Sequence, residues 1–385
     1  MNTNKQKSMY IHIPFCEHIC YYCDFNKVFL EGQPVDEYVD RLLDEIEWGT
    51  KNKTTSFPTI YIGGGTPTSL TATQLDKLLA GITERVSLAD TKEFTIEANP
   101  GDLTEEKLAI IQNYGVNRVS MGVQSFDDRL LKKIGRKHSA QDVTETLHLL
   151  EAKGFSNVSI DLIYALPGQT LDNFRQTLTQ ALTFDLPHYS LYSLILENKT
   201  MFMNWMRKGN MVLPSQEVEL QMFEETIDAM TKAGKFQYEI SNFATPGYES
   251  QHNLMYWDNE EYYGFGAGAS GYVDQKRYRN FGPIQHYLKP LREGTLPIYQ
   301  SESVLRKEQI EEELFLGLRK LAGVSKKAFE KKFGQSFDGI YGDVVTSLVA
   351  KGWLLTDDQH VALTKQGMYV GNDVFEQFLL DKEIN

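Results

Sequence analysis

The sequence predicts an α/β protein, a partial (β/α)6 TIM-like barrel followed by a small winged-helix-like α+β domain. Two observations predict the barrel. Short β-rich runs alternate with helical stripes over residues 1–195, and polar or glycine residues stand after nearly every run. A change of pattern near Leu305 predicts the second domain. At 385 residues the chain is long enough for one large domain and a smaller one.

Six β-rich runs are expected to form parallel strands joined by right-handed helical crossovers. They are residues 9–13, 59–62, 93–97, 118–122, 158–162 and 189–194. The first intervening helix is indicated by apolar residues at helical spacing over residues 35–46. Thr71 and Gln74 predict a capping box for the second helix, and Thr104 predicts a cap for the third. Because the alternation stops after the sixth run, we expect an incomplete barrel.

The three cysteines, Cys16, Cys20 and Cys23, lie within eight positions in the spacing C-x3-C-x2-C. Thiolates bind soft metal centres, and short cysteine loops commonly hold iron–sulfur clusters. Three thiolates can hold three irons of a [4Fe–4S] cluster and leave the fourth iron open to another ligand. A disulfide would leave one cysteine over. A structural zinc site needs a fourth ligand, which His18 could supply, so zinc remains the alternative.

Composition excludes several classes of protein. A net charge of −13 argues against a general nucleic-acid binder, which needs a basic surface. No apolar run approaches the ~18 residues of a membrane span. Residues 1–7 lead into the first β-rich run without a signal-peptide apolar region, and the cysteines are expected to be free thiols. We therefore expect a cytoplasmic protein that reaches a membrane only through partners.

Polar or glycine residues follow five of the predicted strands: the cysteine loop, residues 63–65, Glu97, Gln124 and Asp161. In barrels of this kind the carboxyl ends of the strands build the active site. The oxygens of Glu97 suit an ammonium group or ribose hydroxyls. Asp161 lies in an otherwise apolar strand, which indicates a role in a site.

The whole chain divides by pattern into three expected units: the barrel over residues 1–240, a barrel-covering segment over 241–304 and the winged-helix-like domain over 305–385. The glycine-rich run 262–271 is not a P-loop, because no G-K-[ST] follows. The last unit is expected to contain three helices, a hairpin over 353–363 and a final helix through Val370, Val374 and Phe378. Residues 306–385 hold 11 Lys and Arg against 13 Asp and Glu, so a docking role is favoured over DNA binding.

Several segments together resemble the radical S-adenosylmethionine superfamily. They are residues 10–15, the cysteine loop, and residues 63–68, 97–100, 120–126 and 161–169. More narrowly, the chain resembles the branch that contains oxygen-independent coproporphyrinogen III dehydrogenase and haem chaperones. The resemblance covers essentially the whole chain.

The resemblance implies a role for each matching residue, with no catalytic residue assigned. Cys16, Cys20 and Cys23 would hold a [4Fe–4S] cluster, with S-adenosylmethionine on its open iron. Tyr10, Gly64 and Glu97 would contact that cofactor. Six further residues match positions that hold a second S-adenosylmethionine in the dehydrogenase: Tyr22, Gly65, Thr66, Gln124, Arg136 and Asp161.

Two differences from the dehydrogenase indicate which member of the branch this chain resembles more. The dehydrogenase has a further cysteine two positions after the third, where this chain has Phe25, and it has a longer segment before the cluster loop. Both departures match the haem chaperones, which implies haem binding and delivery of haem to respiratory membrane proteins. Radical decarboxylation of coproporphyrinogen III and a scaffold without radical chemistry remain the alternatives. Homodimerisation is left open.

The segment 252–257 fits an H-N-x-x-Y-W motif that occurs in the chaperone-like proteins and is linked there to haem. His252 offers an imidazole for axial iron ligation, and Tyr256 and Trp257 offer flat apolar faces for a porphyrin. His252 is therefore the haem-ligand candidate. In the alternative interpretation, the aromatic residues pack a loop onto the barrel and His252 caps a turn.

Overall fold

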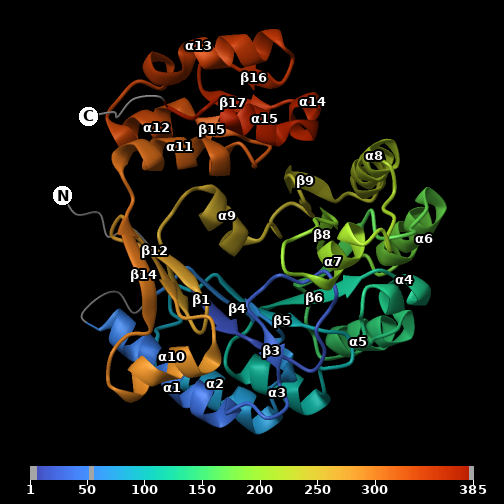
Figure 1. Cartoon of the computed structure of the whole chain (residues 1–385), viewed down its shortest axis with the longest axis vertical. Coiled ribbons are helices and arrows are strands. Elements are labelled where there is room, and N and C mark those ends of the chain that lie inside the picture. Colours follow the sequence, from blue (N-terminus) through green and yellow to red (C-terminus); the bar gives the residue numbers. More distant parts are fainter. Residues whose placement is uncertain (1–6, 52–55, 381–385) are drawn as a thin grey trace.

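The computed structural model describes residues 7–51 and 56–380, so the expectation about residues 1–6 lies outside the described part. A large α/β domain is built around a sheet of twelve strands, and a smaller α+β domain lies above it in the view of Figure 1. Among the described residues, no helix is both long and apolar enough to traverse a lipid bilayer.

The centre of the large sheet consists of the six predicted parallel strands, which are neighbours in chain order. They are β1 (Ser8–Ile13), β4 (Thr59–Gly64), β5 (Glu93–Ala98), β6 (Arg118–Gln124), β7 (Val158–Tyr164) and β8 (His188–Ser193). The helices that connect them are α1 (Val35–Thr50), η1 (Pro67–Ser69), α2 (Ala72–Arg85), α3 (Glu105–Asn113), α4 (Asp128–Lys133), α5 (Ala140–Ala152) and α6 (Leu171–Leu182). The predicted capping box at Thr71 and the cap at Thr104 are confirmed.

Each central strand alternates between two faces, because successive strand residues point in opposite directions. In β4, Ile60 and Ile62 are fully buried in the main apolar core, under the helices. Tyr61 faces the interior, where its hydroxyl reaches Glu97 of the next strand. The interior is therefore polar, and the apolar core lies outside it.

Residues 236–303 extend the sheet at both edges. At one edge β11 (Tyr262–Phe265) pairs in parallel with β1, and β12 (Ser270–Val273), β13 (Lys276–Asn280) and β14 (Ile298–Ser303) follow in antiparallel order. At the other edge are β10 (Asn242–Ala244) and β9 (Phe236–Glu239). The sheet thus ends at β14 and β9 without closing, and the predicted partial barrel is confirmed. The remaining helices here are α7 (Met201–Arg207), α8 (Gln216–Lys232), α9 (Gln251–Trp257) and α10 (Ile284–Arg292).

The C-terminal α+β domain has its own apolar core, formed by residues between Ile310 and Phe378. Its helices are α11 (Arg306–Gly317), α12 (Lys326–Phe333), α13 (Phe337–Ala350), α14 (Lys365–Tyr369) and α15 (Gly371–Glu376), around a sheet of β15 (Val324–Ser325), β17 (His360–Leu363) and β16 (Leu354–Thr356). The prediction of one final helix is wrong, because two short helices meet at Val370, whose φ of −118° interrupts the helical backbone.

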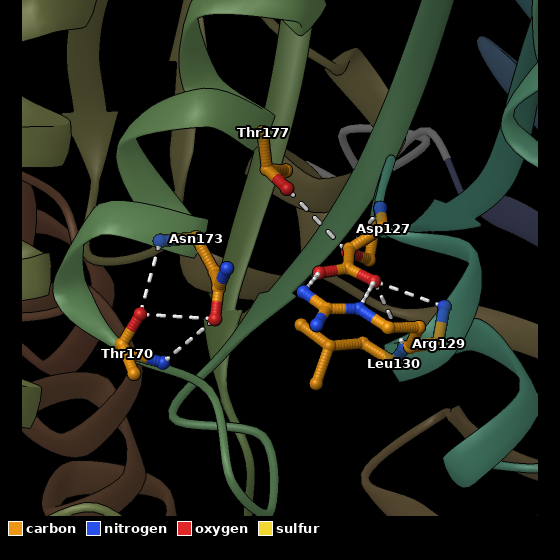
Figure 2. Close-up of polar contacts among 7 residues, drawn as sticks. Asp127, Arg129, Leu130, Thr170, Asn173 and Thr177 are labelled. Carbon is orange, nitrogen blue, oxygen red and sulfur yellow. Dashed lines mark hydrogen bonds and ion pairs between the residues drawn. The ribbon is translucent and has the colours of Figure 1, made fainter.

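A groove of about 360 Å³ lies on the outer surface between α4 and α6. Figure 2 shows polar side chains at the helix ends around this groove. Asp127 accepts hydrogen bonds from the backbone N–H groups of Arg129 and Leu130 and pairs with the Arg129 guanidinium. Thr170 and Asn173 form the capping box of α6. Capping therefore accounts for Asp127, Thr170 and Asn173, whereas the Thr177 hydroxyl lies 3.4 Å from the Ser125 hydroxyl.

Candidate functional site

The cysteine loop leaves the end of β1 and is closed at its base by a short parallel pair, β2 (Phe15–Cys16) and β3 (Val28–Phe29). The Val28 N–H donates to the Pro14 carbonyl over 2.8 Å, and the Leu30 N–H donates to the Cys16 carbonyl over 2.9 Å. Within the loop, the Cys23 N–H donates to the Cys20 carbonyl. These contacts hold Cys16, Cys20 and Cys23 in one compact turn at the barrel mouth.

The thiols lie among donors and cations. The Thr66 hydroxyl donates to Cys16 Sγ over 3.6 Å, and Arg136 Nη1 donates to Cys20 Sγ over 3.5 Å. Burial raises the pKa of Cys16, and it raises the pKa of Cys23 to about 11, against the opposing effect of Lys27. The thiols are close enough for the charge of one to raise the pKa of another.

The donor set around the cysteines bears on both interpretations of the loop. In the part of the chain that the structure describes, no three His, Cys, Asp or Glu side chains converge as ligands of one metal ion. A [4Fe–4S] cluster needs three thiolates that each reach a different iron, and Cys16, Cys20 and Cys23 are free thiols.

The glycine turn after β4 lies against the root of this loop. Gly64 has a φ of +116°, and a Cβ here would lie 2.5 Å from the His12 ring. A Cβ at Gly65 would lie 2.8 Å from the Phe15 carbonyl oxygen. The Gly65 N–H donates to the Ile13 carbonyl over 2.8 Å. Only glycine allows the positive φ at Gly64 and the close approach of Gly65 to the backbone of the cysteine loop.

Glu97, at the end of β5, is held by two donors. The Gly64 N–H donates to Oε2 over 2.9 Å, and the Tyr61 hydroxyl donates to Oε1 over 2.7 Å. Burial raises the pKa of Glu97 to about 7 despite these hydrogen bonds. The Tyr10 ring stacks on the Tyr61 ring at 6.2 Å. Tyr10, Gly64 and Glu97, which were predicted to contact one cofactor, thus lie together on neighbouring strands.

Gln124 ends β6 and Asp161 lies within β7, whereas Arg136 lies in the loop between α4 and α5 and reaches the end of β6 with its side chain. Arg136 Nη2 donates to Asn99 Oδ1 over 2.6 Å and to the Gly122 carbonyl over 2.5 Å. Its buried Nε has no hydrogen-bond partner. Gln124 ends β6 with a φ of +68°, where the register with β7 shifts. Asp161 accepts a hydrogen bond from Ser120 over 3.4 Å, and burial raises its pKa.

These side chains fit an iron–sulfur cluster with a sulfonium amino-acid cofactor. Cys16, Cys20 and Cys23 supply soft ligands, Glu97 supplies an acceptor for an ammonium group, and Arg136 has an unused buried donor. Tyr22 lies beside Cys20 and Arg136. Tyr10, Glu97, Gln124, Arg136 and Asp161 are only half-buried although they face the interior, so this end of the barrel is open.

His252 lies nearer the start of the strands, and its ring stacks on the Tyr61 ring at 5.1 Å. It is the second residue of α9 and is 1% exposed. Its Nδ1 lies 2.8 Å from Thr59 Oγ1, and its Nε2 lies 3.0 Å from the Tyr256 hydroxyl. The Glu93 carboxylate accepts from the backbone N–H groups of Gln251 and His252. Burial lowers the pKa of His252 to about 3. Both ring nitrogens are thus engaged in hydrogen bonds at the closed end of the barrel.

Sequence reasoning missed three polar residues of the site: His12, Asn26 and Asn99. The His12 ring contacts the Tyr10 hydroxyl and the backbone carbonyl of Asn26, which lies just before β3. Asn99 forms hydrogen bonds with both Arg136 and Thr66. The signal for His12 was present, since it shares the inward face of β1 with Tyr10. Asn26 and Asn99 lie in loops, where no periodicity indicates a direction.

Comparison with known proteins gives two family matches. Residues 10–181 match the radical SAM superfamily, and residues 304–370 match the HemN C-terminal domain. The chain is 50% identical over 377 residues to "Heme chaperone HemW" of Lactococcus lactis, covering 98% of each chain. It is 51% identical over 375 residues to "Heme chaperone HemW" of Bacillus subtilis, covering 97% of this chain and 99% of that one.

The fold also resembles a solved structure, coproporphyrinogen III oxidase (HemN) from Escherichia coli, described as a radical SAM enzyme. The TM-score is 0.86 at 23% identity, over 98% of this chain and 90% of that one. This likeness shows the fold. From the family matches and the two full-length relatives, the chain belongs to the radical SAM superfamily and, within it, to the HemW family.

Proposed function

We propose that this protein is a haem chaperone, which holds a [4Fe–4S] cluster with S-adenosylmethionine, binds haem and delivers it to haem-requiring respiratory proteins. The observation that carries the proposal is the full-length identity of about half to relatives named as haem chaperones. The clustered thiols and the Tyr10–Gly64–Glu97 cradle support the cofactors.

The chain's own residues would prepare the site. Cys16, Cys20 and Cys23 would hold the cluster, which when bound supplies one electron to the sulfonium. Glu97 and the Gly64–Thr66 backbone would orient the methionine part of the cofactor, and Arg136 would place positive charge beside Cys20. A second S-adenosylmethionine at Tyr22, Gly65, Thr66, Gln124, Arg136 and Asp161 belongs to the proposal.

The proposal includes the organisation and setting of the chain. Residues 1–240 would act as the cofactor barrel, 241–304 as its cover and 305–385 as a docking domain for protein partners. We place the protein in the cytoplasm, with any membrane contact made through a respiratory partner and with homodimerisation to be tested. Nucleic acid is not among the proposed partners.

The alternative is oxygen-independent oxidation of coproporphyrinogen III. The observation against it is Phe25, whose side chain is 64% exposed where the resembling dehydrogenase has a further cysteine. The fold alone does not choose, because folds of this kind serve many reactions.

One anaerobic experiment separates the two functions. The reconstituted full chain is given haem and, in parallel, coproporphyrinogen III with S-adenosylmethionine and a reductant. We expect stable binding of haem, its transfer to an apo-cytochrome and no loss of carboxyl groups from the porphyrinogen. Formation of protoporphyrinogen without haem binding would overturn the proposal in favour of the alternative.

A further inference from the structure

The chain between β8 and α8, residues 194–213, lies directly on the cysteine loop. The Phe202 N–H donates to the Tyr21 carbonyl over 3.1 Å, and the rings of Tyr21 and Trp205 lie 5.1 Å apart. Phe202 and Met211 are buried in a small apolar cluster that also receives Tyr22. The segment is therefore fixed against the loop that would carry the cluster.

This segment also exposes several apolar side chains. Val212 is 79% exposed and Ile195 is 69% exposed, the two highest values among the large apolar side chains of the described residues. Met201 is 46% exposed, and Met203 is half-buried. Single exposed apolar residues are ordinary, but several in one short segment indicate a binding surface.

The segment is also rich in methionine. It holds four of the chain's 11 methionines: Met201, Met203, Met206 and Met211. A thioether is flexible and polarizable, adapts to flat apolar partners and serves as an axial ligand of haem iron. Residues 194–213 contain no His, Cys or Tyr. Methionine is thus the iron ligand that this surface can offer.

The segment carries a net positive charge, whereas the whole chain is acidic. Lys199, Arg207 and Lys208 are exposed against one acid, Glu197, in a protein with a net charge of −13. Haem has a flat apolar body with two propionate carboxylates at one edge. Cations beside an exposed apolar face match that distribution, since guanidinium and ammonium groups pair with carboxylates.

We propose that residues 194–213 form the haem-docking face, with a thioether of Met201 or Met203 on the iron and with Lys199, Arg207 and Lys208 facing the propionates. This inference rests on the proposed function, which requires that the chain binds haem. It places haem on the cluster side of the barrel, away from His252, whose ring nitrogens are both engaged.

The ligand is tested by titrating the reconstituted full chain with haem and recording the absorption spectrum. The wild-type titration tests the proposed function by itself. In the double variant Met201→Leu/Met203→Leu, which keeps apolar size, we expect altered iron-ligand bands and about tenfold weaker binding. The control is Met368→Leu, at a half-buried methionine of the C-terminal domain. Wild-type spectrum and affinity in the double variant would overturn the proposal while leaving haem binding intact.

The surface is tested separately with Ile195→Glu/Val212→Glu, which introduces carboxylates at exposed positions and leaves the buried cluster untouched. Repulsion of the propionates should weaken haem binding about tenfold or more, with unchanged iron and sulfide content of the cluster. The control is Leu355→Glu, at a position 63% exposed on the C-terminal domain. Equal haem affinity of the double variant, the control and the wild type would overturn the proposed face.

Discussion

The imidazole Nε2 of His12 lies 2.7 Å from the carbonyl oxygen of Asn26. Because a carbonyl only accepts, Nε2 carries the proton, and Nδ1 accepts from the Tyr10 hydroxyl over 2.9 Å. Burial lowers the pKa of His12, which keeps the ring neutral. One histidine thus connects the end of the cysteine loop to Tyr10 and leaves the Tyr10 oxygen free to accept from a ligand.

The side chain of Asn26 should be needed for retention of the cluster. Its Nδ2 donates to the Ala267 and Gly282 carbonyls over 2.8 and 3.0 Å. Asn26→Asp turns a donor into an acceptor facing two carbonyls, at an expected cost of about 2–4 kcal/mol. Because of this cost, we expect less than about half of the wild-type iron content after reconstitution. Asn372→Asp, at an exposed position of the C-terminal domain, should match the wild type. Full iron content in Asn26→Asp would contradict this role.

Gly64 should tolerate no side chain. Gly64→Ala combines strain at a φ of +116° with a clash against the His12 ring. Gly101→Ala is the matched control, because its φ is +85° but nothing lies within 4 Å of the added Cβ. We expect the first variant to lose S-adenosylmethionine binding in equilibrium dialysis and the second to keep it. Equal binding by both variants would show that the cradle is not packed as described.

The guanidinium of Arg136 should raise the reduction potential of the cluster. It brings positive charge and a hydrogen bond to Cys20 Sγ, and such contacts raise the reduction potential of iron–sulfur clusters. In Arg136→Gln we expect a potential more negative by on the order of tens of millivolts in a redox titration. Arg129→Gln, at a side chain 82% exposed, is the control. An unchanged potential in Arg136→Gln would place the cluster away from this residue.

Glu45 should make stability depend on pH. Its carboxylate accepts from Tyr287, Asn280 and the Gly266 N–H, yet burial raises its pKa from 4.5 to about 7. Below pH 4.5 the folded and unfolded states are both protonated, so the contribution to stability is fully present. As pH rises to about 7, the unfolded state ionises more readily, and on the order of 3 kcal/mol is lost.

Denaturant unfolding across this pH range tests the assignment. Glu45→Gln should remove that part of the decline in unfolding free energy, whereas Glu31→Gln, at an exposed position, should keep it. The slope with pH is the readout, because the introduced amide does not titrate and changes local hydrogen bonds by a constant amount. A wild-type slope in Glu45→Gln would show that the carboxylate is not the group that titrates.

The central strands were predictable because sequence and packing agree there. Ile60 and Ile62 alternate with Tyr61 and Gly63, and this alternation marks the two faces of β4. The strand β14 gave no such signal, because all six of its residues are exposed and its pairing depends on β13. The break at Val370 was missed because apolar spacing continues across it while the backbone does not.

The mouth of the barrel was predictable from the residues that end the strands. Cys16, Gly64 and Glu97 stand where consecutive parallel strands stop, and parallel strands bring such positions to one edge. The directions of side chains were not predictable. His252 appeared in the sequence as an available imidazole, yet hydrogen bonds with Thr59 and Tyr256 engage it at the opposite end.

The central claim is a [4Fe–4S] cluster with one iron open to S-adenosylmethionine, and electron paramagnetic resonance tests it most directly. The protein is reconstituted without oxygen, assayed for iron, sulfide and zinc, reduced, and measured with and without the cofactor. We expect about four irons and four sulfides per chain and a spectrum that changes when S-adenosylmethionine is added. One zinc per chain, or a cluster spectrum that the cofactor leaves unchanged, would contradict the account.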